Sequence, residues 1–102
     1  MTLYEYQTKV DAFIQENGGY WPPLNNLARL TEEVGELARI FNRQFGPKTP
    51  KPGETQKEAA DELGDLLFII TTLCAQLELS LSEVAQNNLA KVTKRDTGRF
   101  KA

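Results

Sequence analysis

The stretch LARLTEEVGELAR at residues 27–39 and the stretch EAADELGDLLFIITTLC at residues 58–74 decide the fold. Each carries large apolar residues at spacings of three and four, which is the period of an amphipathic helix. Each also carries two carboxylates three residues apart: Glu33 with Glu36, and Glu62 with Asp65. The two stretches therefore predict two helices that combine an apolar stripe with acidic residues.

Local start and stop signals predict four helices. Ser/Thr-x-x-Glu capping boxes mark three starts, at Thr2, Thr55 and Ser80. Pro22-Pro23 opens a fourth helix, whereas Gly18-Gly19 and Gly46-Pro47 each end one. The predicted helices lie at about residues 3–17, 23–45, 56–78 and 81–95, with a Pro/Gly/Lys loop at 46–54. Because no segment alternates like a strand, the fold class is all-α, and the two long central helices are expected to pack antiparallel in a four-helix fold.

Size and composition limit the possible classes of function. A chain of 102 residues supports one domain, 1–102, and its net charge of −2 provides no basic footprint for duplex nucleic acid. No apolar run approaches the roughly 20 residues that span a bilayer, and the N-terminus lacks the features of a signal peptide. A single cysteine excludes an internal disulfide. These features predict a cytoplasmic protein without a membrane partner.

The carboxylates occupy matching positions on the two central helices. Taking Glu33 as zero, Ile40 lies about 20° away and Glu36 about 60° away on the helical wheel. Taking Glu62 as zero, Ile69 and Asp65 occupy the same two angles, about 20° and 60°. Each helix therefore has one carboxylate within its apolar stripe and a second at the edge of that stripe.

If the two stripes face each other, four carboxylates converge and need a counter-charge. The chain has no histidine and only one cysteine, so the fitting counter-charge is a hard, oxygen-binding cation, Mg²⁺ or alternatively Mn²⁺. A solvated helix face is the simpler interpretation of a single E-E-x-x-E motif. Ion pairs of Arg29 with Glu33 and of Glu32 with Arg39 would also neutralise part of the charge. The repetition of the pattern, in phase with both stripes, favours the metal site.

The residues resemble a known family. Glu32-Glu33-x-x-Glu36 followed by Glu62-x-x-Asp65 is similar to the E-E-x-x-E…E-x-x-D motif of the MazG-like all-α nucleoside triphosphate pyrophosphohydrolases. The segment NNLAKVTKR at residues 87–95 also resembles a later N-x-x-K…R segment of that family. The resemblance covers about residues 20–96.

This resemblance implies a Mg²⁺-dependent hydrolase that converts a nucleoside triphosphate into a monophosphate and pyrophosphate, in nucleotide-pool house-cleaning. By motif position, the metal ligands would be Glu33, Glu36, Glu62 and Asp65. Glu32 would orient or deprotonate the attacking water. Asn88, Lys91 and Arg95 would contact phosphates, although a basic last turn that complements the helix dipole explains the two cations equally well.

A base pocket is expected just before the first motif helix, as the resemblance implies. Trp21 would stack on the base and Asn25 would read its edge, while packing in a core or interface is the alternative for Trp21. Lys48, Lys51 and Lys57 around the loop are weaker phosphate candidates, and exposure to solvent is the simpler explanation for them. The family also implies a homodimer or homotetramer, and the helix over 56–78 is apolar on more than one face, which requires several packing partners.

Two rival functions remain. A di-iron carboxylate bundle uses Glu-x-x-His pairs, and the absence of histidine argues strongly against it. A catalytically inactive helical module of the same fold, binding nucleotides or proteins, is the second rival. The sequence does not indicate the preferred base or sugar, or the number of metal ions.

Overall fold

The structure is a computed structural model, and it describes residues 1–47 and 54–100, apart from the side chains of Glu54 and Thr55. Within this part the chain forms four helices and no strand: α1 (Leu3–Glu16), α2 (Pro23–Phe45), α3 (Glu54–Gln76) and α4 (Leu81–Asp96). The all-α prediction is confirmed, and every predicted helix end lies within two residues of the observed one. The backbone of Thr55 lies inside α3, which begins at Glu54. The side chain of Thr55, on which the predicted cap depends, and the loop residues Lys48 and Lys51 lie outside the described part.

The caps explain where the first and last helices begin. Thr2 and Glu5 form the predicted capping box, with the Thr2 hydroxyl accepting from the Glu5 amide at 3.0 Å and the Thr2 amide donating to the Glu5 carboxylate at 3.2 Å. At α4, the Ser80 hydroxyl accepts from the Glu83 amide at 3.3 Å. Glu58 bonds to Arg43 of α2, which links α3 to its neighbour.

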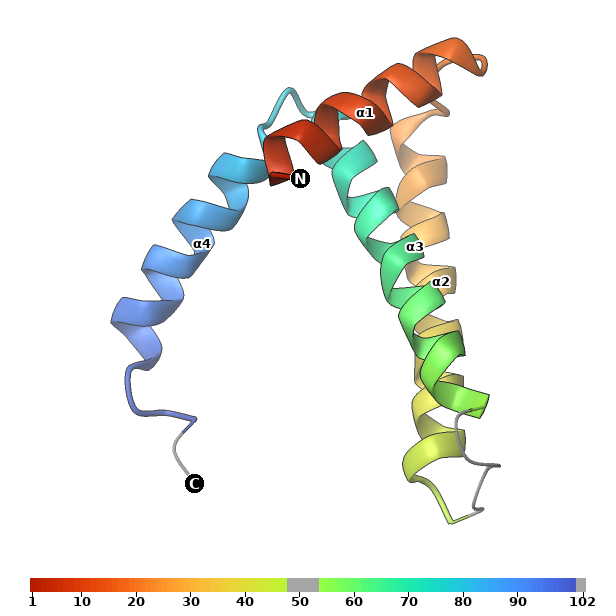
Figure 1. Cartoon of the computed structure of the whole chain (residues 1–102), viewed down its shortest axis with the longest axis vertical. Coiled ribbons are helices and arrows are strands. Elements are labelled where there is room, and N and C mark those ends of the chain that lie inside the picture. The colour runs from red at the N-terminus through yellow and green to blue at the C-terminus, as the bar shows by residue number, and fades with distance from the viewer. Residues whose placement is uncertain (48–53, 101–102) are drawn as a thin grey trace.

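The helices are arranged as one close pair and two attached arms (Figure 1). α2 and α3 lie side by side and antiparallel, as predicted. α1 crosses the end of this pair where α3 finishes, and contacts both α3 and α4. α4 contacts α1 and α3 but makes no contact with α2 in the described residues, and it runs away from the pair.

The turn between α3 and α4 sets the direction of α4. Glu78 adopts a left-handed conformation with φ 58°, and the Leu79 amide donates to the carbonyl of Cys74 at 2.8 Å, which closes the end of α3. The side chain of Gln7 on α1 donates to the Leu79 carbonyl at 2.9 Å and accepts from the Leu81 amide at 2.8 Å. Gln7 therefore fixes the turn to α1.

The core lies along the facing sides of α2 and α3 and beneath α1. Its buried apolar side chains are Val10, Ile40, Ile69, Cys74 and Leu81. Cys74 is a free thiol in this core, as expected, and burial raises its pKa. The core is small because many large apolar side chains remain exposed, including Phe45, which is 72% exposed.

No single helix in the described residues is long and apolar enough to cross a membrane. Gln56–Gln76 and Leu81–Asp96 meet the length and composition requirements only when taken together, and they are bent by 105° where they join.

Candidate metal centre and adjoining pocket

Three of the predicted carboxylates converge between α2 and α3. One carboxylate oxygen from each of Glu33, Glu62 and Asp65 lies within 4.8 Å of the other two. The helical phase accounts for this arrangement, because Ile40 and Ile69, each seven residues after a carboxylate, are both buried. The apolar stripes that hold the helix pair together therefore also bring Glu33 and Glu62 to its seam.

Glu62 is the most buried member of the cluster. Glu62 is only 9% exposed, and its Oε2 atom is buried without a hydrogen-bond partner among the described residues. A buried, unpartnered carboxylate oxygen is costly. Binding of a proton or a cation at this atom would remove that cost.

The surroundings raise the pKa of Glu62 to about 7. The main cause is the hydrogen bond that protonated Glu62 can donate to Glu33, followed by burial and by repulsion from the charges of Glu33, Asp65 and Glu36. When both Glu33 and Glu62 are ionised, neither can donate, which leaves Oε2 unpartnered. A small divalent cation would provide the missing positive charge.

The other two motif carboxylates lie outside the three-residue cluster. Glu36 is exposed and its carboxylate accepts from Arg39 at 2.9 Å. It nevertheless lies close enough to contribute to the raised pKa of Glu62. Glu32 is exposed beside Glu33. The structure thus brings together Glu33, Glu62 and Asp65, with Glu36 at the margin.

The ion pairs that would have neutralised the first motif do not form among the described residues. Arg39 pairs with Glu36 and not with Glu32. Arg29 has no ion pair with Glu33; its guanidinium lies over the Trp21 ring, 5.0 Å from the ring centroid. The charge of the cluster is therefore not cancelled by these arginines.

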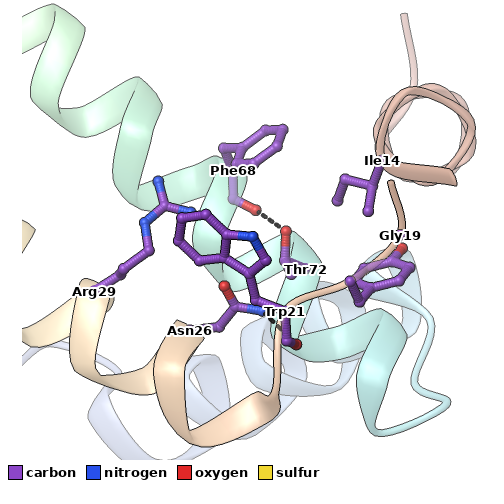
Figure 2. A pocket seen from close by; sticks show the side chains of 8 residues that line it. Ile14, Gly19, Trp21, Asn26, Arg29, Phe68 and Thr72 are labelled. Atoms are coloured by element: carbon purple, nitrogen blue, oxygen red, sulfur yellow. Dashed lines mark hydrogen bonds between the residues drawn. The ribbon is translucent and has the colours of Figure 1, made fainter. Parts of the chain in front are cut away.

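A small pocket lies at the start of α2 (Figure 2). Trp21 and Arg29 lie at its centre, with Phe68 and Thr72 contributed by α3. Its remaining lining residues are Ile14, Gly19, Tyr20 and Asn26. Arg29 precedes Glu33 by four residues and Phe68 follows Asp65 by three, so the pocket lies about one helical turn from the carboxylates.

Asn26, rather than the predicted Asn25, lines this pocket. Asn25 is exposed, whereas Asn26 is 3% exposed. The Asn26 amide donates to Gln76 Oε1 at 2.9 Å and to the Trp21 carbonyl at 3.4 Å, and Gln76 Nε2 donates to the same carbonyl at 2.7 Å. The spacing of seven between Asn26 and Glu33 was the signal in the sequence, because it places both residues on one stripe.

Tyr20 attaches the linker before α2 to α1. Its hydroxyl donates to Asp11 at 2.5 Å. Burial, and then this bond and the charge of Asp11, raise the pKa of Tyr20 to about 12, so the hydroxyl remains a donor. The wall of the pocket is therefore anchored on both sides of Trp21.

The predicted phosphate-binding residues on α4 do not meet the carboxylates within one chain. Asn88 and Lys91 are exposed on a helix that makes no contact with α2. The Arg95 guanidinium donates to Asp96 at 2.7 Å and 3.0 Å, and this bond holds the pKa of Asp96 below its usual range, with a second contribution from Arg99. Arg95 therefore uses its Nε and Nη2 donors to bind Asp96.

Comparisons with known proteins identify relatives of this chain. The MazG nucleotide pyrophosphohydrolase domain matches residues 22–100. The uncharacterized protein YpjD of Bacillus subtilis (strain 168) is 41% identical over 100 residues, which cover 97% of this chain and 90% of YpjD.

Two solved structures share the fold. The crystal structure of B. subtilis YpjD has a TM-score of 0.79 at 40% identity, covering 89% of this chain and 94% of that one. The crystal structure of the Bacillus-conserved MazG protein, a nucleotide pyrophosphohydrolase, has a TM-score of 0.77 at 34% identity and covers 96% of both chains. The chain therefore belongs to the MazG nucleotide pyrophosphohydrolase family.

Proposed function

We propose that this protein is a Mg²⁺-dependent hydrolase that converts a ribo- or deoxyribonucleoside triphosphate into the monophosphate and pyrophosphate. The observation that supports this most strongly is the convergence of Glu33, Glu62 and Asp65 around a buried oxygen without a partner. Such a cluster is unstable unless it binds protons or a cation. Membership of the MazG family supports the choice of a nucleotide substrate.

The residues of the cluster fit a magnesium ion. All of its donors are carboxylate oxygens, which hard cations such as Mg²⁺ and Mn²⁺ prefer. An octahedral ion with bonds of about 2.1 Å holds its ligands about 3–4 Å apart. The three carboxylate oxygens all lie within 4.8 Å of one another, so modest side-chain rotations would bring them to that spacing. Glu36 would be the fourth ligand once Arg39 releases it, which would cost little because an exposed ion pair contributes at most about 1 kcal/mol. The bound ion supplies positive charge that offsets the charge on the phosphate oxygens.

The proposed reaction assigns a role to each acidic residue. Water attacks the α-phosphorus and forms a new phosphorus–oxygen bond, while the bond to the oxygen bridging the α- and β-phosphates breaks and pyrophosphate leaves. Glu32 orients this water and accepts its proton, acting from the solvent side of Glu33. The ligand carboxylates contribute by position, because phosphoryl-type transfer depends mainly on alignment and charge stabilisation.

The pocket beside the cluster is the proposed site of the base. Trp21 offers a stacking surface that is 57% exposed, and base–aromatic stacking contributes about 1–3 kcal/mol. Asn25 does not line this pocket, and its role in reading the edge of the base stays a prediction. The lining allows stacking on many bases, so the substrate is proposed only at the level of a nucleoside triphosphate.

The proposed assembly is a homodimer or homotetramer. The accessible surface of the chain is 7937 Å², whereas a folded monomer of 11.5 kDa exposes about 5,800 Å². The difference of about 2,100 Å² exceeds the ~800 Å² that each partner buries in a standard interface. The radius of gyration of 16.5 Å is likewise larger than the ~13 Å of a globular chain of this length.

Exposed apolar residues indicate which surfaces a second copy covers. They lie on all three helices that carry proposed site residues, at Phe41, Phe45, Leu63, Leu67 and Leu89. Packing α4 of one copy against the α2–α3 pair of another would bring Lys91 and Asn88 toward the acidic cluster, where a basic helix and an acidic site attract. The assembled enzyme is proposed to be cytoplasmic and to remove surplus or non-standard nucleotides.

One observation favours the alternative, an inactive nucleotide- or protein-binding module. Glu36 is held by Arg39, outside the cluster. The two functions differ in whether pyrophosphate is released.

The test is pyrophosphate release from a panel of standard and modified triphosphates, measured with Mg²⁺, with Mn²⁺ and with EDTA. The proposed enzyme would be supported by release that requires the metal. That release should be lost in Glu62→Gln and should persist in Asp61→Asn, which removes a neighbouring charge. Absence of release from the folded wild-type protein across the panel would support the inactive module.

A further inference from the structure

Arg29 differs from the other arginines of the chain in the type of contact that its guanidinium makes. Arg39, Arg43, Arg95 and Arg99 each form an ion pair. Arg29 forms none with any described residue, although Glu32 and Glu33 follow it within one turn of α2. Its guanidinium rests on the Trp21 indole instead, 5.0 Å from the ring centroid.

The position of Arg29 connects the two halves of the proposed site. It lies four residues before Glu33, a rise of about 6 Å along α2, and it lines the pocket that contains Trp21. In a nucleotide, the sugar and phosphate chain join the base to the α-phosphorus. A substrate with its base on Trp21 and its α-phosphorus at the carboxylates would therefore pass beside Arg29.

A nucleotide can replace the Trp21 ring as the binding partner of Arg29. A cation resting on an exposed indole is held more weakly than a guanidinium that makes two parallel bonds to phosphate oxygens. The guanidinium also covers a ring face on which a base could stack. Binding of phosphate by Arg29 and stacking of the base on Trp21 would thus assist each other.

The backbone of Trp21 stays fixed during such an exchange. Its carbonyl accepts from Gln76 at 2.7 Å and from Asn26 at 3.4 Å, which ties it to both α2 and α3. The indole itself remains 57% exposed. The arginine side chain is therefore the part that moves.

We propose that Arg29 is a substrate-binding residue that exchanges partners: it rests on Trp21 in the free protein and moves to the phosphate chain of the nucleotide on binding, which frees the indole face for the base. This inference rests on the proposed function, because it assumes a nucleotide bound across the pocket and the carboxylates. Arginine suits the role because its planar group both stacks on rings and binds phosphate through two donors.

Trp21 is the sole tryptophan of the chain, so its fluorescence reports on this pocket directly. The probes are inorganic tripolyphosphate, which has no base, and an α,β-imido nucleoside triphosphate, which resists hydrolysis, each titrated with Mg²⁺. In the wild type, both should change the fluorescence of Trp21, because phosphate alone draws Arg29 away from the ring.

The test variant is Arg29→Gln, and the matched control is Arg43→Gln, which removes the same charge from an arginine that pairs with Glu58. Arg29→Gln should abolish the response to tripolyphosphate and weaken binding of the imido nucleotide about tenfold. In turnover it should raise KM while changing kcat much less. Arg43→Gln should behave as the wild type. Arg29→Lys is a milder change that is less disruptive to folding. It should recover part of the affinity, because lysine keeps the positive charge but lacks the planar group that binds phosphate through two donors.

The inference would be overturned if the wild type and Arg29→Gln bound the imido nucleotide with equal affinity. It would also be overturned if tripolyphosphate competed with the nucleotide without altering Trp21 fluorescence. The proposed function fails separately. A wild type that binds the imido nucleotide through Arg29 but releases no pyrophosphate would refute the hydrolase and retain this inference. A wild type that binds neither probe would refute both.

Discussion

Replacing Glu62 with glutamine should stabilise the metal-free protein at alkaline pH, although it removes a residue proposed to be essential. Above pH 7 the wild-type protein carries an ionised Glu62 whose Oε2 has no partner. Glutamine has the shape of the protonated acid and its amide can donate to Glu33. The substitution therefore removes repulsion and restores a hydrogen bond.

The magnitude follows from the pKa of Glu62, which is raised from 4.5 to about 7. This difference corresponds to at most about 3 kcal/mol against folding in the ionised state. Solvent reaches the cluster on the side of the exposed Asp65, and screening reduces the effect to about 1–2 kcal/mol. For a domain of this size, the melting temperature of Glu62→Gln should exceed that of the wild type by about 5–10 °C.

The sign of the effect depends on pH. Because the pKa is raised on folding, the stability that Glu62 contributes is fully present below about pH 4.5 and is lost as pH rises through about 7. The two proteins should therefore melt together at pH 4.5 and separate by pH 8. Thermal denaturation in EDTA at one fixed protein concentration measures this difference.

Adding Mg²⁺ should reverse the order. A ligand that binds only the native state at 100 times its Kd adds about 2.7 kcal/mol, and the wild type should gain this stability while Glu62→Gln gains little. Asp61→Asn is the matched control, because it removes the neighbouring exposed charge. The reasoning would be refuted if Glu62→Gln were less stable than the wild type in EDTA at pH 8, or if Asp61→Asn showed the same changes.

Three further substitutions test other parts of the account. Glu36→Gln should abolish turnover and leave the melting temperature nearly unchanged, whereas Arg39→Gln, which frees Glu36, should remain active; retained turnover in Glu36→Gln would remove it from the metal site. Asn26→Ala should lower the free energy of unfolding in urea by about 1–3 kcal/mol, because it leaves buried partners unbonded, and an unchanged midpoint would contradict the observed network. Lys91→Ala should raise KM about tenfold at similar kcat, with Lys9→Ala as the exposed control; an unchanged KM would place the phosphate contact elsewhere.

The helices and the acidic cluster were predictable because local signals determine both. Capping residues, prolines and glycines fix the helix ends, and the helical phase alone places Glu33 and Glu62 on the stripes that pack. Asn26 was missed even though it lies seven residues before Glu33, because amide residues near a helix start are usually solvated.

Contacts between distant segments were not predictable from local patterns. The sequence spacing favours an Arg29–Glu33 pair, but the linker brings Trp21 over α2 and offers Arg29 an aromatic ring instead. The direction of α4 depends on the left-handed Glu78 and on two hydrogen bonds to Gln7, which is far away in the sequence. For this reason Lys91, which is predicted to contact phosphates, lies on a helix that does not contact α2 within one chain.

The most direct test of the central claim is the fate of labelled water. The protein should be incubated with a triphosphate substrate and Mg²⁺ in water enriched in oxygen-18, and the products analysed by mass spectrometry. Attack at the α-phosphorus predicts one labelled oxygen in the nucleoside monophosphate and none in the pyrophosphate. Label in pyrophosphate, release of single phosphates, or no products from folded protein would contradict the proposed reaction.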